Sequence, residues 1–211
     1  MNETYPFKIK PLPYSYNAME PYIDEKTMRV HHDGHLGTYV KNLNNALENY
    51  PGLHNISLKK LLYNLDLLPN EIKTKVKNNG GGVYNHNMYF DGLKNVGINN
   101  VPKGKLKEKI EEQFMNFDNF YNEFTKASHS LFGSGFVWLV LNKDNNLEII
   151  SSPNQDTVLA LGFCPIVLID LWEHAYYLKY NNKKEEYILN YKNIIDWNKA
   201  EERYLNCINK N

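Results

Sequence analysis

The sequence predicts an α+β protein with an all-helical N-terminal half and a mixed α+β C-terminal half. Apolar residues recur at helical spacing in the first half, whereas the second half contains short β-rich runs separated by a polar turn. Between the halves, residues 95–104 are polar, contain Pro102 and Gly104, and show no periodicity. We therefore place one domain at residues 1–98 and a second at residues 99–211.

The N-terminal half begins with an extended, proline-containing arm over residues 1–20. Asp24 is the expected N-cap of a long helix that reaches about Tyr50, with a kink or close packing expected at its two glycines, Gly34 and Gly37. A further helical run starts near residue 57 and restarts at Pro69. The glycine triplet at 80–82 is expected to break this helix, and another helical turn or two follows.

The C-terminal half begins with an amphipathic helix predicted over residues 105–127. FVWLVLN, KDNN and LEIIS then indicate a strand, a turn and a strand, and the apolar stretch 163–170 indicates a third, buried strand. Two helical segments, near 184–195 and 197–209, complete the chain.

Composition narrows the possible partners and compartment. The 24 basic and 24 acidic side chains balance, which argues against a nucleic-acid binder held by a general positive field. No apolar run is long enough to span a membrane and no secretory signal is visible, so we expect a cytoplasmic protein with no nucleic-acid or membrane partner. Cys164 and Cys207 show no CxxC spacing, and we expect both to be reduced and structural.

Asp170 poses the main question of the sequence. It ends an apolar run in FCPIVLIDLWEHAYYLKY, and a carboxylate buried there is costly unless a positive group pairs with it. Histidines occur in similar settings: His31 and His35 share one helix face, His86 lies among tyrosines, and His174 follows Asp170 by four residues. Each alone is most simply a hydrogen-bonded core residue. Together, imidazoles and one carboxylate form a set that a first-row metal ion accepts.

Two other chemistries fit less well. A zinc protease is disfavoured because the HExxH motif does not occur. Asp170 and Glu173 could act as the carboxylate pair of a glycosidase, but no pattern of cleft-lining residues supports that interpretation.

The chain resembles the iron/manganese superoxide dismutase family over nearly its whole length. The similarity lies in six segments in the family's order: LPY at 12–14, HHDGHLGTYVKNLN at 31–44, YNHNMYF at 84–90, FGSGFVWLV at 132–140, NQD at 154–156 and DLWEHAYYLKYNN at 170–182. The resemblance implies an N-terminal antiparallel helical hairpin domain, and a C-terminal domain with a small three-stranded antiparallel sheet flanked by helices.

The resemblance also implies the site and its reaction. One manganese ion per subunit, or iron, would be held by His31, His86, Asp170 and His174, with solvent in a fifth position. The reaction would be the disproportionation of superoxide, a small anionic substrate, to dioxygen and hydrogen peroxide. The protein would tune the metal potential through its ligands and their surroundings, and the anionic Asp170 would favour the higher oxidation state.

Further roles follow from the same similarity. Gln155 would hydrogen-bond the metal-bound solvent, and Tyr39 would orient substrate and pass protons at the entrance beside His35. Trp138 and Trp172 would be aromatic walls, which is also compatible with ordinary core packing. His32 has no role in the family.

Glu173 and Tyr177 resemble residues that cross a twofold interface, where the glutamate would bind the partner's His174 and the tyrosine the partner's His35. The implied assembly is a homodimer, with a tetramer as the alternative.

The ligand set allows more than one metal and more than one function. Gly82 and Gln155 form the manganese-like pattern, but iron or dual-metal use is also allowed by the same ligands. Two alternative interpretations to a superoxide dismutase are a non-catalytic metal-binding protein and a hydrolase that uses a metal-bound hydroxide. Four departures from the family's usual residues are expected to alter the walls of the pocket or funnel without touching a ligand: Leu36, Gly37, Phe90 and Phe136.

Overall fold

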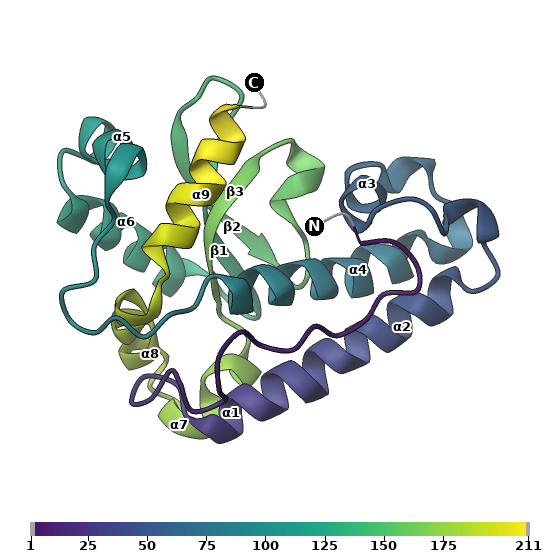
Figure 1. The fold of residues 1–211 in the computed structure, drawn as a ribbon, viewed down its shortest axis with the longest axis horizontal. Coiled ribbons are helices and arrows are strands. Elements are labelled where there is room, and N and C mark those ends of the chain that lie inside the picture. Colours follow the sequence, from purple (N-terminus) through teal and green to yellow (C-terminus); the bar gives the residue numbers. More distant parts are fainter. Residues whose placement is uncertain (1–2, 210–211) are drawn as a thin grey trace.

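The structure is a computed structural model that describes residues 3–209. Residues 1–2 of the predicted arm and residues 210–211 of the predicted C-terminal domain lie outside the described residues. The fold is α+β, as predicted, with helices first and a three-stranded sheet in the C-terminal half (Figure 1). No helix among the described residues is both long enough and apolar enough to cross a membrane.

The elements follow one another along residues 3–209 in this order: α1 (Glu25–Arg29), π-helical η1 (Val30–Leu36), α2 (Gly37–Leu47), η2 (Pro51–Leu53), α3 (Leu58–Tyr63), η3 (Leu65–Leu67), α4 (Asn70–Asp91), α5 (Gly104–Phe114), α6 (Phe117–Ser130), β1 (Gly135–Leu141), β2 (Leu147–Pro153), η4 (Val158–Leu161), β3 (Cys164–Asp170), η5 (Glu173–Ala175), α7 (Tyr177–Tyr180), α8 (Lys184–Tyr191), η6 (Lys192–Ile194) and α9 (Trp197–Ile208).

The N-terminal half is a hairpin in which α2 and α4 lie side by side (Figure 1). The first arm of the hairpin is helical without interruption from α1 through η1 to α2, close to the predicted span. The predicted disturbance near its glycines takes the form of the π-helical turn η1, a geometry that often occurs at functional sites. The preceding arm is tied to α2 by two hydrogen bonds between Asn44 and the backbone of Phe7.

The glycine triplet does not break the second arm of the hairpin, so that prediction is wrong. Helix α4 continues through the triplet. These glycines form no turn, and their lack of a side chain lets neighbouring groups approach the helix closely. A Cβ atom on Gly81 would lie 2.1 Å from the carbonyl oxygen of Gln155, and one on Gly82 would lie 2.4 Å from Cγ of Tyr39. The triplet therefore brings α4 close to both residues.

Two helices, α5 and α6, occupy the region where a single helix was predicted over residues 105–127. The prediction of one continuous helix is therefore wrong. Met115 has a φ angle of 70° and ends α5. Asn116 then caps α6 by accepting a hydrogen bond from the backbone N–H of Asn119 at 2.8 Å. The apolar stripe continues across both helices, which is why periodicity alone does not reveal the break.

The sheet has the strand order β2-β1-β3, and both pairings are antiparallel. Every residue of the central strand β1 is buried, which explains its unbroken apolar sequence. Phe136 of β1 pairs with Asp170, the last residue of β3. Because α9 packs against β3 and α6 packs against β1 and β2, the sheet holds Asp170 in a covered position.

The two cysteines form a disulfide, which contradicts the expectation that both are reduced. Cys164 begins β3 and Cys207 lies near the end of α9, with their Cα atoms 5.9 Å apart. The pair is distant in sequence but is brought together when α9 packs along β3. Spacing alone therefore gave no sign of the bond.

Closing a chain segment with a sequence separation of 43 residues restricts the unfolded state, and the chain-entropy relation gives a stabilisation of about 4 kcal/mol. We expect the Cys164→Ala/Cys207→Ala variant to lose a large part of this free energy in denaturant unfolding. A reductant should lower the stability of the wild type and leave the variant unchanged. Equal sensitivity of both proteins to the reductant would contradict a stabilising bond.

Candidate metal centre

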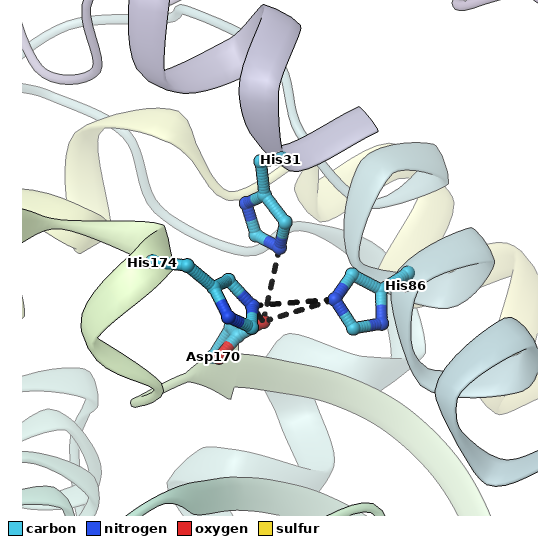
Figure 2. A group of neighbouring side chains, drawn as sticks. All are labelled: His31, His86, Asp170 and His174. Atoms are coloured by element: carbon cyan, nitrogen blue, oxygen red, sulfur yellow. Dashed lines mark hydrogen bonds and ion pairs between the residues drawn. The ribbon is translucent and has the colours of Figure 1, made fainter. Parts of the chain in front are cut away.

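The four predicted ligands converge on one point. The ligand atoms of His31, His86, Asp170 and His174 all lie within 4.8 Å of one another (Figure 2). They come from four separate elements, namely η1, α4, the end of β3 and η5. The helical hairpin thus contributes two of these side chains, and the segment that begins with the last strand contributes the other two.

Distances within the cluster fit a single ion. The Oδ2 atom of Asp170 lies 3.2 Å from Nε2 of His31, 3.8 Å from Nε2 of His86 and 3.5 Å from Nε2 of His174. The Nε2 atoms of His86 and His174 are 3.3 Å apart. An ion roughly 2 Å from each of four atoms requires them to be about 3–4 Å apart. The donor set of three imidazoles and one carboxylate suits a first-row transition metal.

Hydrogen bonds around the cluster fix which atoms face its centre. Nδ1 of His86 lies 2.7 Å from the carbonyl oxygen of Gly82, which can only accept, so Nδ1 carries the proton and Nε2 presents its lone pair. Oδ1 of Asp170 accepts a hydrogen bond from the backbone N–H of Trp172 at 2.9 Å, which leaves Oδ2 for the centre. These contacts orient two of the four groups as ligands.

Burial and charge set the protonation of the cluster. Burial alone would raise the pKa of Asp170, but the neighbouring charge and hydrogen bonds of His174 and His31 outweigh it and hold that pKa well below its usual value. Burial lowers the pKa of His31 to about 4 and also lowers that of His86 well below 6.5. At neutral pH the site therefore contains an ionised carboxylate and, at these two positions, neutral imidazoles, the protonation states that bind a metal cation.

Gln155 and Tyr39 lie together next to the cluster. Gln155 donates from Nε2 to the hydroxyl oxygen of Tyr39 at 3.1 Å, so the phenolic proton remains available for donation. Burial raises the pKa of Tyr39, and the phenol is therefore protonated at neutral pH. Asn85 donates to Oε1 of Gln155 at 3.2 Å and holds the carboxamide from its other side.

Asn85 is a residue that the sequence reasoning missed. It is fully buried, immediately precedes His86 and also donates to the backbone oxygen of Gln155 at 3.2 Å. The only sequence signal was an amide in an apolar, aromatic stretch of helix. Its role depends on the close contact between α4 and the loop after β2, which local sequence does not reveal.

The predicted aromatic neighbours occupy different places around the cluster. The ring of His35 stacks on that of His174 with centroids 4.1 Å apart, and Trp172 stacks on the same ring at 5.5 Å. Trp138 is fully buried one layer further away and donates from Nε1 to the hydroxyl of Ser152 at 2.9 Å. Trp172 therefore lines the cluster directly, whereas Trp138 packs behind Phe136, with centroids 5.9 Å apart.

Of the four residues that depart from the family's usual pattern, two phenylalanines lie beside the predicted ligands. The Phe90 ring lies 4.9 Å from the His31 ring, and the Phe136 ring lies 6.3 Å from the His86 ring. Leu36 is buried, and Gly37 faces the side chain of Ile9. None belongs to the ligand cluster. His32 likewise points elsewhere, with its ring nitrogens 2.7 Å from a carboxylate oxygen of Asp33 and 2.8 Å from the Lys10 carbonyl oxygen.

Comparison with known proteins agrees with this geometry. Residues 6–94 match the family model for the alpha-hairpin domain of iron/manganese superoxide dismutases, and residues 102–203 match the model for their C-terminal domain. The chain belongs to the iron/manganese superoxide dismutase family.

Similar proteins cover almost the entire chain. A manganese superoxide dismutase of Bacillus anthracis is 46% identical over 202 residues, which are 96% of each chain. A manganese superoxide dismutase of Thermus thermophilus is 48% identical over 198 residues, or 94% of this chain and 97% of the relative. A Staphylococcus aureus protein named for manganese and iron together is 46% identical over the same shares. The predicted family is confirmed, and these relatives are named for manganese or for manganese and iron.

We expect Gly82→Ala to disturb the site, because its methyl group would overlap the Tyr39 ring and separate the phenol from Gln155. Gly80→Ala is the matched control, since its Cβ would meet only leucine methyl groups at 3.4 Å or more. Helix propensity favours alanine by about 1 kcal/mol, so the control should be at least as stable as the wild type. Thermal unfolding and a crystal structure of each variant test this, and an unmoved Tyr39 in Gly82→Ala would contradict it.

Stability of the metal-free protein should fall as the pH is lowered. The pKa of His31 in the folded chain is about 4 instead of 6.5, so between these values the unfolded chain binds a proton that the folded chain does not. This difference favours unfolding as pH decreases through that window. We expect denaturant unfolding to show lower stability at pH 5 than at pH 7, with a smaller difference in His31→Gln. The same pH dependence in both proteins would exclude His31 as its source.

Proposed function

We propose that this protein is a superoxide dismutase that converts two superoxide anions into dioxygen and hydrogen peroxide. The observation that carries the proposal is the convergence of three imidazoles and one ionised carboxylate on one buried point. Membership of the iron/manganese superoxide dismutase family supports the same reaction. The enzyme is accordingly an oxidoreductase that depends on a bound transition metal.

His31, His86, Asp170 and His174 would hold the ion in this proposal. Bound manganese or iron supplies the electron transfer, because either metal can alternate between two oxidation states. The full negative charge of Asp170 offsets part of the ion's charge and favours the higher oxidation state. The neutral histidines offset less, so the ligand set tunes the potential.

Gln155 and Tyr39 would supply orientation and protons. The carboxamide of Gln155 is fixed between Asn85 and the Tyr39 hydroxyl, so one of its two amide hydrogens remains directed elsewhere. Tyr39 retains its own proton and is only partly buried, a suitable arrangement for a residue that links the site to solvent. Proton delivery is required because peroxide leaves as the protonated product.

His35 and the tryptophans would control access. His35 is partly exposed and stacks on His174, so it lies between solvent and the cluster. Trp172 also stacks on the His174 ring. It donates from Nε1 to the Asn154 carbonyl oxygen at 3.0 Å, and this bond fixes the plane of the indole. Trp138 would support this wall from behind.

Manganese is the favoured metal. Glycine at position 82 leaves room for the Tyr39 ring, and Gln155 supplies the carboxamide from the other half of the chain. This is the manganese-like arrangement described above. Iron or dual-metal use remains the alternative, since the same ligands accept both ions and one relative is named for both.

A homodimer would complete the surroundings of the site. Glu173 and Tyr177 flank the His174 segment and are exposed in the single chain, and Tyr177 keeps 48% of its surface. Leu178 on α7 is 47% exposed, and Val30 on η1 is 43% exposed. Helix α1 contacts both α7 and η1. Exposed apolar side chains beside a carboxylate suit a twofold contact, in which Glu173 would bind the partner's His174 and Tyr177 the partner's His35. A tetramer is the alternative assembly.

The remaining parts of the proposal concern organisation and location. We place the helical domain at residues 1–98 and the mixed domain at residues 99–211, so that each supplies two ligands. We propose a cytoplasmic location, with no nucleic-acid or membrane partner.

His86→Ala and Asp170→Ala should each remove most of the bound metal and abolish superoxide consumption. His54→Ala is the matched control, because His54 bonds only the Leu47 carbonyl oxygen and stacks on Tyr5. Elemental analysis and superoxide consumption after loading with manganese or iron provide the measurements.

The outcomes of that experiment separate the alternatives. Normal metal content in His86→Ala would refute the ligand assignment. A wild-type protein that binds metal but consumes superoxide no faster than the free ion would be a non-catalytic metal-binding protein. Hydrolytic activity with redox-silent zinc would instead support the hydrolase reading.

Glu173→Ala should weaken the dimer and accelerate metal loss from His174, because a carboxylate across the interface would no longer hold that imidazole. Sedimentation velocity at decreasing protein concentration measures the first effect, and transfer of metal to a chelator measures the second. Glu185→Ala, on an exposed site of α8, serves as the control. An unchanged dimer in Glu173→Ala would argue against this interface.

A further inference from the structure

One face of helix α4 contacts the loop that carries Gln155. This loop, which we call the Gln155 loop, consists of residues 154–157 between β2 and η4. Lys77, Gly81 and Asn85 follow one another at intervals of four residues along α4, so they share one face of the helix. All three meet the Gln155 loop, and each makes a different kind of contact.

Two of these contacts hold Gln155 itself. Gly81 leaves room for its backbone, since a Cβ atom at that position would lie 2.1 Å from the Gln155 carbonyl oxygen. Asn85 donates from Nδ2 to the same carbonyl oxygen and to Oε1 of the carboxamide, both at 3.2 Å. Helix α4 therefore fixes the backbone of Gln155 and one side of its side chain.

The third contact is an ion pair between Lys77 and Asp156, the residue that follows Gln155. Nζ of Lys77 lies 2.8 Å from Oδ1 of Asp156, and the two side chains are 43% and 33% exposed. A partly exposed ion pair of this kind contributes little to folding stability. Its effect is local, because it ties the residue next to Gln155 to the same face of α4.

The backbone of Asp156 is held separately, from the sheet. Its carbonyl oxygen accepts a hydrogen bond from the Ser152 hydroxyl at 2.8 Å, and that hydroxyl accepts one from Nε1 of Trp138 at 2.9 Å. Ser152 and Trp138 are both buried, so this connection is anchored in the core. The sheet thus holds the main chain of Asp156, while Lys77 holds its carboxylate.

A cleft borders the Gln155 loop. It has a volume of about 230 Å³, and its lining includes Lys77, Ser152, Asp156 and Thr157. None of the four predicted ligands lines it. Because side chains do not fill this space, close packing does not restrain the loop on the side of the cleft. The ion pair between Lys77 and Asp156 supplies a restraint there instead.

We propose that Lys77 is a positioning residue for the carboxamide of Gln155, on which it acts through Asp156. This inference rests on the proposed function, in which Gln155 acts beside the metal ion. Gln155 donates to the Tyr39 hydroxyl oxygen at 3.1 Å, so a shift of the Gln155 loop would lengthen or break that bond. Loss of the ion pair would loosen this contact without removing any group from the site.

A loosened carboxamide changes the surroundings of the bound ion. Polar groups next to the ligands tune the reduction potential of a metal, and a dipole that samples several orientations contributes differently from a fixed one. The hydrogen bonds from Asn85 remain, so the carboxamide is displaced but not released. We therefore expect Lys77 to influence the potential of the ion while leaving the amount of bound metal unchanged.

The test compares Lys77→Gln with Lys73→Gln in the manganese-loaded protein. Lys73 is the matched control, because it lies four residues earlier on α4 and pairs with Asp66 at 2.9 Å, outside the Gln155 loop. In Lys77→Gln the hydrogen-bonded backbone amides of Asn154 and Asp156 should exchange hydrogen roughly threefold faster or more. A mediated redox titration should show a shifted midpoint potential, with metal content and the thermal unfolding midpoint close to those of the wild type. Lys73→Gln should change neither exchange nor potential.

A double-mutant cycle tests whether Lys77 acts through Asp156. Asp156→Asn should shift the potential as Lys77→Gln does, and the double variant should shift it no further, because all three proteins lack the same ion pair. Lys77→Arg retains the charge and should keep the potential of the wild type. Shifts that add in the double variant would overturn the proposed route through Asp156.

Unchanged exchange and potential in Lys77→Gln would overturn the positioning role, as would equal changes in Lys73→Gln. Neither measurement uses superoxide, so this failure is distinct from failure of the proposed function. The latter would be seen in the loaded wild type, as superoxide consumption no faster than that of the free ion.

Discussion

The structure depends on the burial of one carboxylate. Asp170 is fully buried at the end of an apolar strand, and an ionised group there is tolerable only beside compensating charge and hydrogen bonds. The three imidazoles and the N–H of Trp172 supply part of this compensation, and a bound cation would supply the rest. The hairpin, the sheet and the turn after β3 all serve to bring these groups to Asp170. The same constraint makes the site sensitive to substitution, because removing one partner leaves a buried charge without part of its compensation.

Much of this arrangement could be predicted from the sequence. The central strand β1 and the strand ending at Asp170 were evident from their apolar runs, and the family motifs identified the four convergent side chains. Metal chemistry was also foreseeable, since three imidazoles and one carboxylate in apolar settings form a ligand set that a first-row metal ion accepts. These features are local, or are encoded by motifs whose order is itself informative.

What the sequence did not predict depends on contacts between distant segments. Gly81 and Gly82 looked like helix breakers, but they are small because Gln155 and Tyr39 lie against α4. The break at Met115 interrupts an apolar stripe that does not change phase. Cys164 and Cys207 meet only because α9 lies along β3, and Asn85 acquires its role only through Gln155. In every case except the break at Met115 the partner is remote, and local propensity gives no information about it.

The placement of the four convergent side chains also has a consequence for synthesis of the protein. Asp170 follows His31 by 139 residues, and His174 follows His86 by 88 residues. A nascent polypeptide that ends before β3 therefore contains only two of the four convergent side chains. An ion held by all four groups could enter only after β3 and η5 have been synthesised and have packed against the helical hairpin.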